Sequence, residues 1–251
     1  MPGSVLQDPV IRQKAEALLA RMNLEQKIGQ MTLTERLSVT PADVRAFHLG
    51  GVLSGSGSCP GSNRPEDWVA MNDAYWAASM ARDEKRLAIP LLYGVDAIHG
   101  HNNVRGATIF PHNIGLGATH NPKLLRKIGE VTAKEIRVTG QEWTFAPTIA
   151  VVRDDRWGRT YEGYSEHPEV TASYAGELIE GIQGVAGSPS FLQGAHVIAT
   201  AKHFVGDGGT TNGKDQGDNV MSEHDFRDLQ AAGYPVAINH GAQCVMASFS
   251  S

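Results

Sequence analysis

The stretch PLLYGVDAIHGHNN, residues 90–103, decides the fold. An apolar run begins after Pro90, is too short for a helix, and ends at Asp96, where a loop rich in His and Asn follows. This pattern predicts a short strand. Asp96 is then a carboxylate at a strand end, where it either faces a pocket or caps the turn that follows.

Similar short runs lie on both sides of this stretch. They are GGVLS (51–55), WTFAP (143–147), HVIATAKHF (196–204) and CVMASF (244–249), and an earlier run near Met31 is one more candidate strand. Amphipathic helices are expected between them, since Asn121 and His167 each precede a proline and Ser222 stands three residues before Asp225. Strand and helix in alternation predict a parallel sheet, either open or closed into a barrel.

The chain is expected to open with two short helices. Apolar residues recur at helical spacing between Asp8 and Met31, and Asn23 with Gln26 forms a candidate capping box. No GxGxxG follows a strand and no GxxxxGK[ST] occurs, which argues against a nucleotide-binding open sheet.

Composition limits the class of protein and of partner. The 251 residues are 41% apolar and 20% charged, as in an ordinary globular protein, and the net charge of −5 with scattered Lys and Arg argues against nucleic acid. An uncharged substrate fits better. Cys59 and Cys244 stand far apart without a CxxC pair, so two free thiols are predicted. No apolar run is long enough to span a membrane and no signal peptide is recognisable, so the compartment stays open.

Four polar side chains occur at or just past predicted strand ends: Asp96, Arg159, Lys202 and His203. Such a set suits a pyranose ring, because adjacent hydroxyls donate to one carboxylate while Lys, Arg and His donate back to the same oxygens. The alternative is a salt-bridge network that closes the top of a barrel.

Other polar and aromatic side chains give weaker signals. His99, His101 and His112 are closely spaced, but no carboxylate or cysteine partner completes a metal site, so loop histidines bonded to backbone are expected. An aromatic patch around Arg159 either stacks on sugar or packs loops, and Phe249 either floors a pocket or fills the interior. The aromatic residues around Arg159 are Trp157, Tyr161 and Tyr164.

The loop GTTNGKDQGDN and the residues just before it contain three carboxylates: Asp207, Asp215 and Asp218. Any of the three is a conceivable general acid. Because the segment is rich in glycine and polar residues, we expect a solvated loop instead.

Four blocks together resemble glycoside hydrolase family 3, in its exo-acting β-glucan glucohydrolase and β-glucosidase branch. They are YGVDAIHGHNNVRGATIFPHNIGLGAT, RDDRWGRTYEGYSE, ATAKHFVGDGGTTNG and VMASFSS, and the resemblance extends from about Leu24 to Ser251. It implies an α/β fold with a (β/α)8 TIM-like barrel. Residues 1–251 would be the N-terminal catalytic barrel domain, truncated after about six strands and incomplete at its C-terminus, with the second α/β domain absent.

The resemblance also implies the residues that bind substrate. These are Asp96, Arg159, Lys202 and His203, with Met246 and Phe249 on the same pocket wall; Phe249 stands where relatives often have Tyr. Non-proline cis bonds are implied at Lys202–His203 and Phe204–Val205.

The implied reaction is the hydrolysis of terminal non-reducing β-D-glucosyl residues by a retaining mechanism, which needs two carboxyl groups. The nucleophile and the acid/base are both expected beyond Ser251, so the isolated chain is expected to be inactive. No metal or organic cofactor is expected. The implied partners are a β-glucoside or β-glucan oligosaccharide and the remaining C-terminal part of the same protein, and the resemblance favours a periplasmic or secreted location.

Three other functions stay open on the sequence. One is a non-catalytic carbohydrate-binding or pseudo-enzyme module. The second is β-N-acetylglucosaminidase, which is disfavoured because no histidine lies between His203 and His224. The third is a barrel lyase or aldolase, for which Lys202 is the only strand-end candidate to form a Schiff base.

Overall fold

The computed structural model describes residues 8–81, 83 and 86–250. Its strands are β1 Leu33–Glu35, β2 Gly51–Ser54, β3 Leu92–Val95, β4 Trp143–Thr144, β5 Thr200–Phe204 and β6 Cys244–Ala247. Its longer helices are α1 Pro9–Leu19, α4 Pro65–Met80, α6 Pro122–Val138 and α7 Pro168–Gln183. The shorter ones are α2 Leu24–Gln30, α3 Pro41–Phe47, α5 Asn113–Gly117, α8 Glu223–Asp225 and α9 Gly233–Asn239.

The strands are parallel and follow one another in sequence order. β1 to β4 form one sheet in the order β1-β2-β3-β4, and β5 pairs with β6. Isolated parallel bridges join the two sheets, at Trp143–Ile198 and Thr148–Lys202. A (β/α) barrel has this strand order. The α/β class and the parallel pairing are therefore confirmed, while closure into a barrel remains a prediction.

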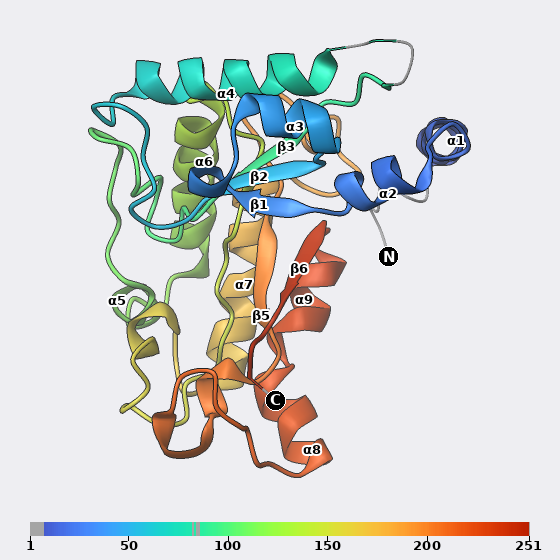
Figure 1. Cartoon of the computed structure of the whole chain (residues 1–251). Coiled ribbons are helices and arrows are strands. Elements are labelled where there is room, and N and C mark those ends of the chain that lie inside the picture. Colours follow the sequence, from blue (N-terminus) through green and yellow to red (C-terminus); the bar gives the residue numbers. More distant parts are fainter. Residues whose placement is uncertain (1–7, 82, 84–85, 251) are drawn as a thin grey trace.

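Helices cover the strands in two groups (Figure 1). On one side α3 and α4 lie over β2 and β3, where Val44, Val52 and Tyr93 are part of a small buried cluster. The larger core lies between the strands and the packed helices α6, α7 and α9. At the contact between α6 and α7, a Cβ on Gly129 would come within 3.0 Å of the Gly181 backbone, so both glycines permit close approach.

The helix starts follow the predicted caps. Asn23 and Gln26 form the capping box of α2, and Asn121 Oδ1 accepts from Leu124 N at the start of α6. Ser222 likewise accepts from Asp225 N before α8. At α7 the proline starts the helix, but the His167 side chain makes no capping bond.

Two further predictions are confirmed by the backbone and the thiols. The peptide bonds Lys202–His203 and Phe204–Val205 are cis, as is Ala146–Pro147, which was not predicted from the sequence. Cys59 and Cys244 are free. Among the residues that the structure describes, no helix is long and apolar enough to cross a membrane.

Candidate functional site

The first pair of the site joins β3 to β5. Asp96 directly follows β3, and its Oδ1 accepts a hydrogen bond of 3.0 Å from Nζ of Lys202, within β5. Lys202 is 3% exposed, and its main chain is held by bonds to Pro147 and Ile149. A buried ammonium requires an anionic partner, which Asp96 supplies from the partly exposed side.

The second pair lies in the loop after β4. Arg159 precedes a 3₁₀ turn, η3 Thr160–Glu162, and donates from Nε and Nη2 to the two oxygens of Glu162, at 2.8 Å each. This is the bidentate geometry that guanidinium and carboxylate groups prefer. Glu162 is 3% exposed and also accepts from the Thr148 hydroxyl at 3.2 Å.

The electrostatics of the second pair keep both groups charged. Burial acts to raise the pKa of Glu162, but the hydrogen bonds and charge of Arg159, with the charge of Lys202, outweigh it and hold that pKa below 4.5. Burial acts to lower the pKa of Arg159, and its bonds to Glu162 more than compensate. The pair is therefore a fixed salt bridge at neutral pH.

The third pair connects the first two. Nδ1 of His203 lies 2.7 Å from Oδ2 of Asp207, and Nε2 of the same ring lies 3.3 Å from Nη2 of Arg159. Asp207 belongs to a second 3₁₀ turn, η4 Asp207–Gly209, and is 5% exposed. The sequence-based expectation of a solvated loop is therefore wrong for Asp207, while Asp218 is exposed.

The structure thus brings together the four side chains predicted to converge. Asp96 contacts Lys202 and Arg159 contacts His203. Lys202 and His203 are neighbours in β5, so the two contacts lie side by side. Their role in binding substrate remains a prediction. Sequence reasoning missed Glu162, although its place three residues after Arg159 in one loop was a readable signal for a charge pair.

Met246 and Phe249 differ in their placement. Met246 is the registered neighbour of Lys202 in the β5–β6 pair, and its place on the wall of a substrate pocket stays a prediction. Phe249 is 84% exposed, so the alternative in which it fills the interior is wrong. It lies after β6, where its ring is not enclosed by the described residues.

The aromatic patch around Arg159 separates into buried and exposed members. Trp157 and Tyr164 are buried, and Trp157 Nε1 donates to Asp215 Oδ1 at 2.8 Å, so these rings pack the loop. Only Tyr161 of the three is exposed, at 40%. Its ring lies 4.8 Å from that of His112, centroid to centroid.

The closely spaced histidines bond to side chains, which corrects the expectation of backbone partners. His99 Nε2 lies 3.1 Å from His112 Nδ1, and His101 Nε2 lies 2.9 Å from the Thr139 hydroxyl. Within the described residues, no group of three or more His, Cys, Asp or Glu side chains is placed to hold a metal ion.

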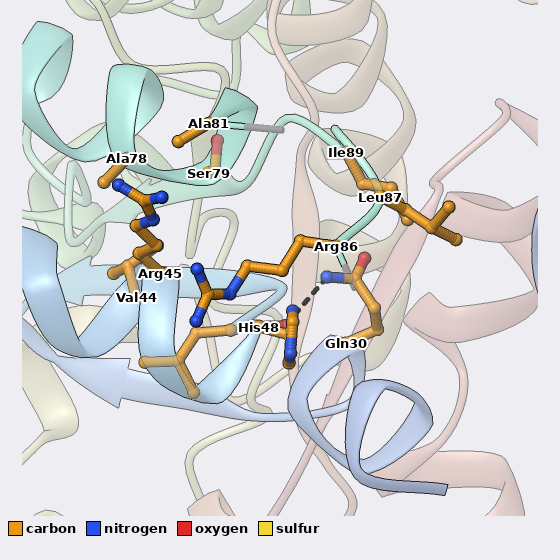
Figure 2. Close-up of a pocket in the computed structure, with 11 residues that line it drawn as sticks. Gln30, Val44, Arg45, His48, Ala78, Ser79, Ala81, Arg86, Leu87 and Ile89 are labelled. Carbon is orange, nitrogen blue, oxygen red and sulfur yellow. Dashed lines mark hydrogen bonds between the residues drawn. The ribbon is translucent and has the colours of Figure 1, made fainter. Parts of the chain in front are cut away.

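A small cavity lies at the other end of the strands (Figure 2). Its walls come from segments that precede β1, β2 and β3, with Gln30, His48 and Arg86 among them, whereas Asp96 follows β3. Gln30 Nε2 donates to the main-chain oxygen of His48 at 2.9 Å, as the dashed line shows. The volume of about 20 Å³ has room for about one water molecule, so this cavity does not take a sugar.

The bonded state of Lys202 argues against the lyase or aldolase alternative. A Schiff-base lysine needs a neutral amine with a free lone pair. Nζ of Lys202 is instead bonded to a carboxylate.

Comparison with known proteins gives one consistent result. The profile described as "Glycosyl hydrolase family 3 N terminal domain" matches residues 23–251. A "Periplasmic beta-glucosidase" of Salmonella typhimurium is 29% identical over 93% of this chain and 28% of its own length.

Two solved structures are similar to this chain over nearly all of its length. The exo-1,3/1,4-beta-glucanase ExoP of a Pseudoalteromonas species superposes with a TM-score of 0.93 and 49% identity, over 100% of this chain and 32% of that one. A mutant beta-glucosidase of Listeria innocua in complex with laminaribiose superposes with a TM-score of 0.76 and 28% identity, over 95% and 33%. The chain spans about a third or less of the length of these relatives.

Proposed function

Because the chain belongs to glycoside hydrolase family 3, we propose that it binds the terminal glucosyl unit of β-glucosides or short β-glucans for hydrolysis with retention of configuration. The observation that carries this proposal is the paired cluster of Asp96, Lys202, Arg159 and His203. The β-glucosidase and exo-β-glucanase names of the relatives support the same substrate class.

The cluster offers complementary partners for a neutral polyhydroxylated ring. Asp96 is 26% exposed on its side chain and carries acceptor oxygens, while the Lys202 ammonium beside it donates. The Arg159 side chain is 32% exposed and has donors beyond those bonded to Glu162. A sugar hydroxyl both donates and accepts, so it can donate to the Asp96 carboxylate and accept from the Lys202 ammonium at the same time.

The same pairing bears on which groups perform the chemistry. Retaining hydrolysis needs one carboxylate as nucleophile and a second carboxyl group as acid and base. Here Asp96 is bonded to Lys202, Glu162 to Arg159, and Asp207 to His203. We therefore assign these three carboxylates to binding and support, and neither the nucleophile nor the acid/base to any of them.

The relatives are about three times longer, and the matching profile is that of an N-terminal domain. We therefore propose that residues 1–251 are the barrel domain of a two-domain protein, and that further polypeptide supplies the reacting carboxyl groups. The periplasmic relative supports a periplasmic or secreted location.

The test is hydrolysis of an aryl β-glucoside by the protein encoded by the complete gene, followed by proton NMR. Retention predicts that β-glucose forms first and then mutarotates. The aryl β-N-acetylglucosaminide serves as the comparison substrate. If neither glycoside is cleaved but glucose still binds, the non-catalytic binding module is the better description.

A further inference from the structure

The hydrogen-bond partners of His203 determine which of its ring nitrogens carries the proton. Nε2 faces Nη2 of Arg159 at 3.3 Å, and a guanidinium can only donate. This contact favours Nε2 as an acceptor. Nδ1 faces Oδ2 of Asp207 at 2.7 Å, so the proton of a neutral ring lies on Nδ1 and is donated to that carboxylate.

Other protonation states leave two donors facing each other. An imidazolium would place an N–H of Nε2 against an N–H of Arg159. A neutral ring with its proton on Nε2 would do the same, and it would also require Asp207 to be protonated. The side chain of Asp207 is 8% exposed and that of His203 is 12% exposed, so water is poorly placed to relieve either conflict.

We infer that Asp207 is a positioning residue, which fixes His203 as the Nδ1–H tautomer so that Nε2 recognises the ligand as a hydrogen-bond acceptor. This inference differs from the sequence-based expectation that Lys, Arg and His all donate. Asp207 does not itself contact the ligand in this scheme. It acts through the ring that it orients.

The consequence for recognition concerns a single hydroxyl. The contact of 3.3 Å between Nε2 and Arg159 is longer than most N–H hydrogen bonds, so a ligand group can replace it. A hydroxyl that lies beside both nitrogens can bridge them, because it donates to Nε2 and accepts from Arg159. A fluorine or an ether oxygen only accepts, so it leaves Nε2 without a proton donor. This step rests on the proposed function, whereas the tautomer does not.

The first experiment measures the tautomer directly in the full chain. With ¹⁵N-labelled histidine, the ring nitrogens of His203 are assigned by the signals that disappear in His203→Gln. We expect Nδ1 to appear protonated and Nε2 unprotonated at neutral pH. A protonated Nε2, in either the neutral ring or the imidazolium, would overturn the inference.

The second experiment tests Asp207 by substitution. Asp207→Ala removes the acceptor of the Nδ1 proton and leaves only the longer 3.3 Å contact with Arg159 to favour this tautomer, so a mixture of tautomers should appear. Asp218→Asn, which removes an exposed carboxylate from the following loop, should leave the Nδ1–H form intact. If Asp207→Ala does not fold, Asp207→Leu keeps the branching at Cγ, removes the acceptor and serves the same purpose. An unchanged tautomer in the folded variant would show that Asp207 does not control it.

The third experiment tests the hydroxyl rule with glucose and its monodeoxy and monodeoxyfluoro analogues. At one ring position we expect the fluoro analogue to bind as weakly as the deoxy analogue, about tenfold or more below glucose. The fluoro penalty should shrink in Asp207→Ala. Fluoro analogues that all bind like glucose would refute the hydroxyl rule. Failure of glucose itself to bind would count against the proposed function, and the tautomer measurement would still decide the role of Asp207.

Discussion

Nζ of Lys202 lies 3.0 Å from Oδ1 of Asp96, although 106 residues separate them in the chain. The contact joins the residue that follows β3 to a residue within β5, across β4. Since the Lys202 side chain is 4% exposed, this carboxylate is the partner that makes its burial tolerable. The pair therefore links the stability of the site to the sugar binding that we propose for it.

Asp96→Ala should lower kcat/KM on an aryl β-glucoside by orders of magnitude in the protein encoded by the complete gene. The charged acceptor would be lost, and its bonds to ring hydroxyls are expected to tighten toward the oxocarbenium-like transition state. Asp96→Asn should be only partly better than Ala, because it keeps the shape but not the charge. Near-wild-type activity of the folded Ala variant would assign Asp96 to a structural role alone.

Glu162→Gln should lower the free energy of unfolding at pH 7 by about 2 kcal/mol, since hydrogen bonds between charged groups contribute roughly 1.5–3 kcal/mol. The pKa of Glu162 is below 4.5 in the folded chain, so its stabilisation is present above pH 4.5 and is lost as the pH falls through the folded value. The free energy of unfolding, measured with urea, should change less between pH 7 and pH 4 for the variant than for the wild type.

Glu169→Gln is the matched control, because Glu169 has an exposed side chain on α7. It should leave both the stability and its pH dependence close to wild type. Equal pH dependence of Glu162→Gln and the wild type would contradict the assigned pKa direction.

His101 should make the free energy of unfolding fall with acid at a higher pH than Glu162 does. Burial lowers the pKa of His101 from 6.5 to about 4, so the unfolded chain binds the proton more readily. The stability should therefore be complete above pH 6.5 and fall by about 3 kcal/mol toward pH 4. Unfolding measured across this range should show a flatter profile for His101→Gln. A wild-type profile as flat as that of the variant would refute the shift.

Gly117→Ala should destabilise the protein strongly, by about 3 kcal/mol or more. A Cβ at Gly117 would stand 1.8 Å from the main-chain oxygen of Tyr164, two residues after Glu162, so α5 would have to move from the loop that holds Arg159. Gly115→Ala in the same helix is the control, because the nearest atom to its added Cβ would be at 3.9 Å. Similar melting temperatures for the two variants would show that the contact is not rigid.

The strands and helix starts could be predicted from the sequence because their signals are local. The short apolar runs around Val52, Val95 and Ala201 became β2, β3 and β5, and Asn23, Asn121 and Ser222 cap the helices that they were expected to open. The four polar residues at strand ends were predicted to meet, because parallel strands present the same ends on one side of a sheet. The structure places them in contact.

The tertiary structure alone decided which of these side chains pair and which protons they hold. Composition and spacing do not report a distance, so neither the burial of Asp207 nor the bidentate bond from Arg159 to Glu162 was predicted. The direction of hydrogen bonding at His203 follows from groups on three separate segments, and a donor or acceptor role exists only once those groups face each other. Local patterns thus determined the elements and the strand ends, and packing determined the chemical state of the site.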